Sequence, residues 1–169
     1  MDDRSDARAG LTPDIRGNLV ADDDARALAA GLLRSGHGAL ATLLDARPMA
    51  MRVACLWIGG VGMTMLVSGL SDQSRALDQD PACALLLGGA GDERGDAGDP
   101  LGGPRLTLRG RAEPCDKAAR RAEWQADRPR AAVCYDIADL RLVRLRLSEA
   151  ILTAGFGRGV RLGPGDLPA

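Results

Sequence analysis

The feature that most constrains this chain is a series of short apolar runs joined by tight turns. Residues 49–58 and 61–68 are both typical of strands, and Gly59 and Gly60 between them favour a hairpin turn. The remaining strand-like runs are residues 37–44, 82–87, 105–113, 140–147 and 151–156. Because helices do not alternate regularly with these runs, the pattern predicts an α+β domain around an antiparallel barrel of six to seven strands.

Three segments with helical spacing flank the predicted strands, at residues 22–35, 71–79 and 116–126. Residues 1–20 are polar and interrupted by glycine and proline, so we expect a flexible N-terminal arm. The barrel domain is then residues 21–163, followed by a short tail at residues 164–169.

Two finer features complete the expected map. Residues 88–103 are rich in glycine and aspartate, which predicts a mobile loop. The alternation of apolar and polar residues slips at Leu142 and Val143, which indicates a β-bulge in that strand.

Charge and composition exclude several classes of function. The chain has 22 basic and 23 acidic residues and only 2% aromatic residues, which argues against binding to nucleic acid. It has no apolar run long enough to span a membrane and no signal-peptide core, so we expect a cytoplasmic protein. The four cysteines lie too far apart in sequence for a metal-binding motif, which favours reduced structural thiols.

The strongest candidate for chemistry is the junction between the strand at 61–68 and the helix at 71–79. The hydroxyls of Ser68, Ser71 and Ser74, the guanidinium of Arg75 and the free amides of the helix start all fall here. Several donors beside the positive end of a helix dipole suit a phosphate monoester. The alternative is an ordinary helix that Ser71 caps, with Arg75 in solvent.

A second candidate is Arg52, which lies in the middle of the apolar run 49–58. An arginine there must reach solvent, a carboxylate or a ligand, and an outward-facing side chain is the alternative to a binding role. Three further arginines share one face of the predicted strand at residues 105–113, namely Arg105, Arg109 and Arg111. Arg109 and Arg111 need no binding role, because side chains on a solvent-exposed face of the sheet are often charged.

Four segments together resemble the pyridoxamine 5'-phosphate oxidase-like FMN-binding split barrels, with most likeness to the branch that includes heme-utilisation proteins. The segments are residues 38–43, 68–81, 99–113, and 139–145 together with 155–158. Their order and spacing cover about residues 22–167. The resemblance implies a split barrel, an FMN cofactor and a homodimer.

The resemblance also implies cofactor-binding positions, which are Arg52, Val67, Ser68, Ser71, Gln73, Ser74, Arg75 and Arg105. Arg52 matches a strand arginine that contacts the flavin phosphate, and Ser68 matches a hydroxyl beside the flavin. Ser71 and Gln73 match the Ser-x-Lys positions of the family. Arg105 matches a polar residue that reaches the flavin bound by the other subunit.

The chain departs from the family pattern at the phosphate site. Gln73 replaces a lysine or histidine, and Ala76 replaces a common asparagine. Arg75 is an alternative source of the missing charge, one position along the helix. The lone histidine, His37, leaves no match for the substrate-binding Arg-x-His of the oxidase, so the sequence argues against pyridoxamine phosphate chemistry.

The sequence thus favours a homodimeric FMN-binding flavoprotein, an oxidoreductase acting with a small-molecule substrate or electron donor. No side chain stands out as an obligate acid or base, so no catalytic residue is assigned. The chain ends at Ala169 without the extra domain of heme-utilisation proteins, which argues against heme degradation. Two alternatives remain open: a non-catalytic flavin- or heme-binding protein of this fold, and an apo relative with a decayed phosphate site.

Overall fold

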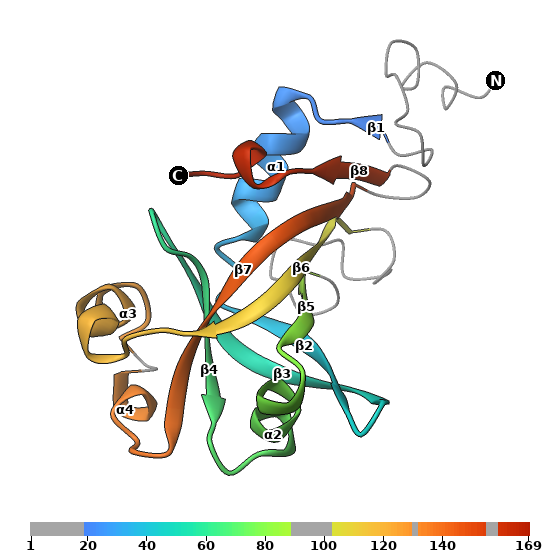
Figure 1. The fold of residues 1–169 in the computed structure, drawn as a ribbon. Helices are drawn as coiled ribbons and strands as arrows, with labels where there is room; N and C mark the ends of the chain where they lie inside the picture. The colour runs from blue at the N-terminus through green and yellow to red at the C-terminus, as the bar shows by residue number, and fades with distance from the viewer. Residues whose placement is uncertain (1–18, 89–102, 130–131, 155–158) are drawn as a thin grey trace, which may run out of the picture.

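The computed structural model describes residues 19–88, 103–129, 132–154 and 159–169, and its centre is a closed antiparallel barrel (Figure 1). The six barrel strands are β2 (His37–Leu44), β3 (Arg47–Ile58), β4 (Gly62–Ser68), β5 (Ala82–Gly88), β6 (Arg105–Pro114) and β7 (Leu140–Thr153). They follow the order β7-β4-β3-β2-β5-β6, and β6 pairs back onto β7 to close the barrel. The predicted α+β split-barrel fold is confirmed.

Two short strands extend the sheet beyond the barrel. β8 (Gly159–Leu162) pairs antiparallel with β7, and β1 (Leu19–Val20) pairs parallel with β8. The last two residues of the expected N-terminal arm therefore belong to the sheet. The expected tail holds a 3-10 turn, η3 (Pro164–Asp166), after which Leu167 is buried in the core.

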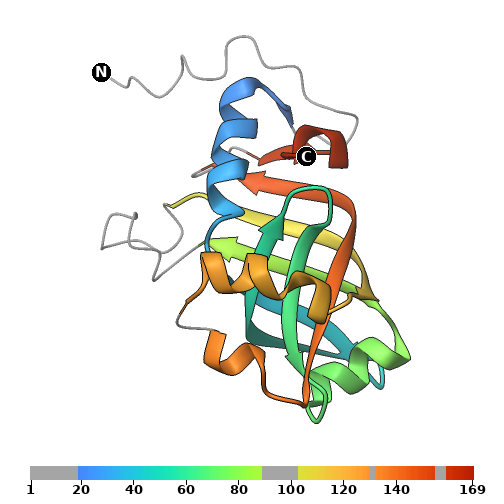
Figure 2. The same ribbon diagram turned by 90° about the vertical axis from the view of Figure 1, so that its left-hand side faces the viewer.

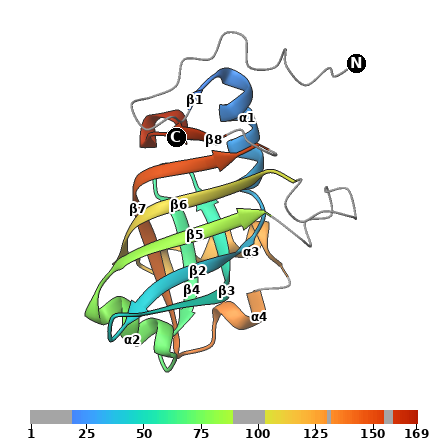
Figure 3. The same cartoon turned by 90° about the vertical axis from the view of Figure 1, so that its right-hand side faces the viewer.

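Helices cover parts of the barrel. α1 (Asp23–Leu32) and η3 lie at one end, and α2 (Asp72–Gln79) lies at the other, where β4 finishes (Figure 1). Two helices, α3 (Arg121–Asp127) and α4 (Ala132–Tyr135), lie over the outside of β3 and β4 (Figure 2). No described helix crosses the outer face of β2, β5 and β6 (Figure 3).

Apolar side chains form two separate clusters. The larger cluster fills the barrel and includes Cys55, Met65 and Leu108, all of them fully buried. The smaller cluster lies outside the barrel, where Trp124 and Tyr135 pack on β3, β4 and β7. We call it the outer cluster, and it consists of Leu56, Ile58, Leu66, Trp124, Tyr135 and Leu142.

The bulge expected at Leu142 and Val143 is not there. Both residues keep an unbroken register with β4, and both are buried, Leu142 in the outer cluster and Val143 inside the barrel. Burial on both faces of the sheet removes the alternation that the prediction relied on. The irregularity lies instead between β6 and β7, at Arg109 and Gly110.

Other predicted boundaries also change. The two strands predicted at 140–147 and 151–156 form one strand through Thr153, and residues 155–158 lie outside the described residues. The helix predicted at 116–126 is a 3-10 turn, η2 (Ala118–Arg120), followed by α3. Of the predicted mobile loop, residues 89–102 lie outside the described residues, and Gly88 belongs to β5.

Candidate functional site

Hydrogen bonds join the three predicted serines where β4 turns into α2. Ser71 caps the helix: its Oγ accepts from the amide of Ser74 at 3.2 Å and donates to the carbonyl of Ser68 at 2.7 Å. The hydroxyl of Ser68 donates to Asp139 Oδ2 at 2.6 Å. We call these three residues the serine cluster. These bonds are those of a helix that Ser71 caps, which was the alternative to a phosphate site in the sequence analysis.

A guanidinium that the sequence analysis did not single out lies against the serine cluster. Arg141 is opposite Val67 in the β4–β7 register, and its Nη1 donates to Ser74 Oγ at 2.9 Å. Arg141 also makes two hydrogen bonds of 2.9 Å with the Asp78 carboxylate, which lower the pKa of Asp78 and raise that of Arg141. Ser74 itself is only 2% exposed. Arg141 thus joins Ser74, in the first turn of α2, to Asp78 one turn later.

The two other predicted helix positions point elsewhere. Gln73 is 2% exposed, and its Nε2 donates to the carbonyl of Leu40 at 3.0 Å, which ties α2 to β2. Arg75 is exposed and pairs with Asp72 one turn earlier, at 2.7 Å. Among the described residues, the guanidinium that contacts the serine cluster is therefore that of Arg141.

Arg52 and Arg105 lie apart from the serine cluster, on the outer face of the barrel. Arg52 is exposed on β3 opposite Ala39, in a row that continues across β5 to Thr107 on β6. Arg105 lies two residues before Thr107, so it shares that face, and it donates to the carbonyl of Gly103 at 3.4 Å. The structure brings these two arginines to one sheet face rather than to one point.

The same outer face exposes apolar side chains. Leu43 on β2 is 43% exposed and Leu86 on β5 is 39% exposed, with the exposed Ala41 and Ala50 between them. No described helix covers these residues (Figure 3). These apolar residues are therefore neighbours on one uncovered sheet face.

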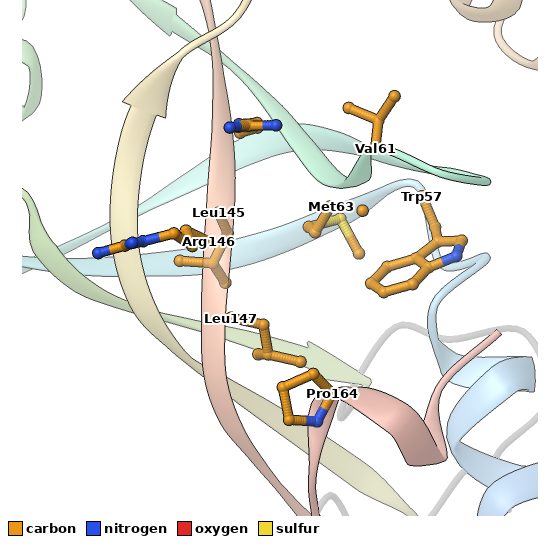
Figure 4. A pocket seen from close by; sticks show the side chains of 9 residues that line it. Trp57, Val61, Met63, Leu145, Arg146, Leu147 and Pro164 are labelled. Atoms are coloured by element: carbon orange, nitrogen blue, oxygen red, sulfur yellow. The ribbon is translucent and has the colours of Figure 1, made fainter. Parts of the chain in front are cut away.

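A pocket of about 240 Å³ lies at the opposite end of β4 from the serine cluster (Figure 4). Its lining residues are Trp57, Val61, Gly62, Met63, Arg144, Leu145, Arg146, Leu147 and Pro164. The buried indole nitrogen of Trp57 has no hydrogen-bond partner in the described part of the chain. None of the predicted cofactor-binding residues lines this pocket.

Two of the cysteines, Cys55 and Cys83, are poor candidates for thiol chemistry. Among the residues that the structure describes, no group of three or more histidine, cysteine, aspartate or glutamate side chains is arranged to hold a metal ion. Burial raises the pKa of the Cys55 thiol to about 12 and that of Cys83 to about 11, so both thiols stay protonated and unreactive near neutral pH. No helix within the described ranges has the length and apolar character to cross a membrane.

The chain is similar to several solved structures, although no family model and no curated protein matches its sequence. One solved structure is 36% identical with a TM-score of 0.77, over 86% of this chain and 96% of the other. A heme binding protein from Mycobacterium smegmatis is 28% identical with a TM-score of 0.73, and the alignment covers 89% of this chain but only 63% of that protein.

A third similarity concerns the fold alone. A protein from Clostridium acetobutylicum, related to general stress protein 26 and described as pyridoxinephosphate oxidase family, has a TM-score of 0.65 at 12% identity. The alignment covers 86% of this chain and 99% of that one. The same barrel therefore recurs over nearly the whole length of a protein with little sequence in common.

Proposed function

The chain belongs to the pyridoxamine 5'-phosphate oxidase-like split-barrel family, and from that premise we propose that it is an FMN-binding protein. The observation that carries the proposal is the contact of Arg141 with Ser74 in the first turn of α2, beside the cap residue Ser71 and close to Ser68. Hydroxyls, helix amides and a guanidinium at one point are the donor set that a phosphate monoester requires.

The residues present fit a flavin phosphate. The amides of Asp72 and Gln73, in the first turn of α2, have no acceptor within the helix, so they are available to a bound oxyanion. Gln73 carries no charge and is held by the Leu40 carbonyl, so Arg141 is the cation beside these amides, and a phosphate would share it with Asp78. Bound FMN would supply redox chemistry, and the protein would hold its phosphate and limit the access of water to the ring.

We extend the proposal to a homodimer. The outer face with Leu43 and Leu86 is apolar and uncovered by described helices, and Arg52 and Arg105 lie on it. A second copy packed there would bury this surface and bring its Arg105 towards the first protomer. We expect an interface of roughly 2,000 Å² or more, which sedimentation at micromolar concentration would detect as a dimer.

Isothermal titration with FMN tests the phosphate site through two matched arginines. Arg141→Gln should weaken binding at least tenfold, since hydrogen bonds to charged groups contribute about 1.5–3 kcal/mol. Arg75→Gln is the control, because Arg75 is paired with Asp72 in solvent and its loss should leave the affinity unchanged. A larger loss from Arg75→Gln than from Arg141→Gln would contradict the assignment of Arg141.

The family carry-over adds a further comparison in the same titration. The resemblance to the family implies that Arg52→Ala weakens FMN binding more than Ser74→Ala does, whereas the position of Arg52 apart from the serine cluster predicts the reverse order. Bleaching of the flavin absorbance by a nicotinamide donor would then support an oxidoreductase role. Binding without such reduction would favour a non-catalytic flavin carrier.

Heme binding is the second candidate function, and the similarity to the Mycobacterium smegmatis heme binding protein favours it. His37, the one histidine in the chain, is exposed at the start of β2 and is therefore accessible as an axial ligand. Titration with hemin should shift the Soret band of free hemin, and His37→Ala should abolish that shift. A band unchanged by that substitution would contradict ligation by His37.

A further inference from the structure

We propose that the pocket at the start of β4 is a second binding site, and that its ligand is a small apolar monocarboxylate of medium chain length. The pocket takes its lining from β3, the β3–β4 turn, β4, β7 and η3. This proposal does not depend on FMN, because the pocket shares no lining residue with the serine cluster.

The pocket forms where β7 separates from β4. Pairing between the two strands runs from Ser68 opposite Leu140 to Thr64 opposite Arg144, and then stops. Beyond Arg144, β7 continues to pair with β6, while Gly62 at the start of β4 still pairs with β3. The two strands therefore diverge at this end of the barrel, and the space between them is open to a ligand.

The walls of the pocket are apolar. Trp57, Met63, Leu145, Leu147 and Pro164 line it, and Figure 4 shows the Trp57 ring facing Leu145 and Leu147 across the space. Its volume of about 240 Å³ exceeds the roughly 150 Å³ of an apolar cavity that admits benzene. An alkyl body of about eight carbons would gain about 0.8 kcal/mol for each methylene that leaves water.

Two arginines lie at the outer side of the gap between β4 and β7, on the opposite face of β7 from Leu145 and Leu147. Arg144 and Arg146 both pair with one carboxylate, that of Glu113, at 2.8 and 3.0 Å. Arg111 on β6 lies directly opposite Arg146. The guanidinium of Arg111 is 3.9 Å from the Asp80 carboxylate, which is a loose ion pair. Two guanidinium groups that share one carboxylate leave one positive charge, which matches a ligand with a single negative charge.

Arg146 is free to turn towards a bound carboxylate. In the structure it extends along the outer face towards Glu113, away from Trp57 (Figure 4). Its side chain is 67% exposed, and an exposed ion pair of this kind contributes only about 0–1 kcal/mol. A carboxylate at the mouth would therefore compete with Glu113 for Arg146 at little cost in free energy.

The two indole N–H groups of the chain make the test direct. Octanoate, added to the ¹⁵N-labelled full-length protein, should shift the Trp57 indole resonance in a saturable way, and Trp57→Phe identifies that resonance. Trp124 is the internal control, since its indole donates to Thr64 in the outer cluster and should not move. No shift of the Trp57 resonance up to about 10 mM octanoate would overturn the proposal.

Variants and ligand analogues separate the charged part of the proposal from the apolar part. Arg146→Gln should weaken octanoate binding by roughly fivefold, the upper range for an exposed ion pair, and 1-octanol should bind the wild type correspondingly less tightly. Arg109→Gln is the matched control, because Arg109 is similarly exposed and paired, with Glu149, but lies outside the pocket. Equal affinities for octanoate and octanol would overturn the carboxylate assignment.

The length of the alkyl chain of the ligand provides the last part of the test. From hexanoate to octanoate, affinity should rise roughly fourfold per methylene, as burial of about 0.8 kcal/mol per group predicts. Affinity independent of chain length would show that the alkyl body stays outside the pocket, and would overturn the proposal.

Discussion

The two tryptophans of this chain lie close to the same hairpin and are packed in opposite ways. Trp124 is 1% exposed in the outer cluster, its indole donates to Thr64 Oγ1 at 3.1 Å, and its ring lies 5.6 Å from that of Tyr135. Trp57 is half-buried beside an open pocket, and its indole nitrogen has no partner among the described residues.

The difference separates the parts of the barrel that maintain the fold from a part available to a ligand. In the outer cluster, every polar atom of the Trp124–Thr64 pair is used: Thr64 also donates to the carbonyl of Leu56 at 2.8 Å. At the pocket, the same type of side chain has a buried indole nitrogen with no partner among the described residues. Substitutions of the tightly packed Trp124 should therefore lower the free energy of unfolding. Substitutions of the loosely packed Trp57 should mainly change ligand binding.

The largest expected effect is that of Trp124→Ala. Removing a fully buried indole leaves a cavity and should lower the free energy of unfolding by about 3–5 kcal/mol. Trp57→Ala should cost about 1–2 kcal/mol, because part of its ring already faces solvent and the pocket. Urea denaturation of both variants checks the pair, and equal losses would contradict the contrast between the two sites.

The next effect is that of Thr64→Val, which keeps the side-chain shape but removes the hydroxyl. The buried indole of Trp124 and the carbonyl of Leu56 then both lose a partner. Leaving such groups unpaired should cost about 1–3 kcal/mol in unfolding free energy. A neutral Thr64→Val substitution would show that water reaches this part of the outer cluster.

Tyr135 provides a pH-dependent test of the same cluster. Burial raises the pKa of its phenol to about 12, above the ordinary value of about 10, so folding favours the protonated form. Its contribution to stability is complete below pH 10 and is lost as the pH rises from about 10 to 12. Because Tyr135 is the single tyrosine, absorbance near 295 nm should titrate near 12 in the folded protein and near 10 in urea.

The smallest expected effect is that of Trp57→Phe. The substitution removes an indole donor without a described partner and keeps an aromatic ring at the pocket, so stability should change by less than about 0.5 kcal/mol. Thermal unfolding of Trp57→Phe and Thr64→Val, measured side by side, compares the two losses of stability. A large loss from Trp57→Phe would mean that the indole has a partner outside the described residues.

The barrel could be predicted from the sequence because its signals are local. Gly59 and Gly60 between two apolar runs identify the β3–β4 hairpin, and Ser71 at the junction identifies the start of α2. The true length of β7 and the outer cluster depend on which helix packs on which strand face. Leu142 shows this, since its burial under α3 and α4 has no local signal.

In the candidate site, too, some features follow from local sequence and others depend on how distant segments pack. The serine cluster follows from residues close together in the sequence, so its convergence was predictable. Arg141 was missed because its approach to Ser74 depends on the β4–β7 register, which joins segments some seventy residues apart. The burial of Gln73 against Leu40 likewise depends on how α2 docks on β2.

A comparison of FMN with riboflavin tests the central claim most directly. The two ligands share the flavin ring and differ in the phosphate, so a site built from the serine cluster and Arg141 must distinguish them. We predict that FMN binds to each protomer at least tenfold more tightly than riboflavin, as measured by quenching of flavin fluorescence. Equal affinities, or no FMN binding at hundreds of micromolar, would contradict a flavin phosphate site at the start of α2.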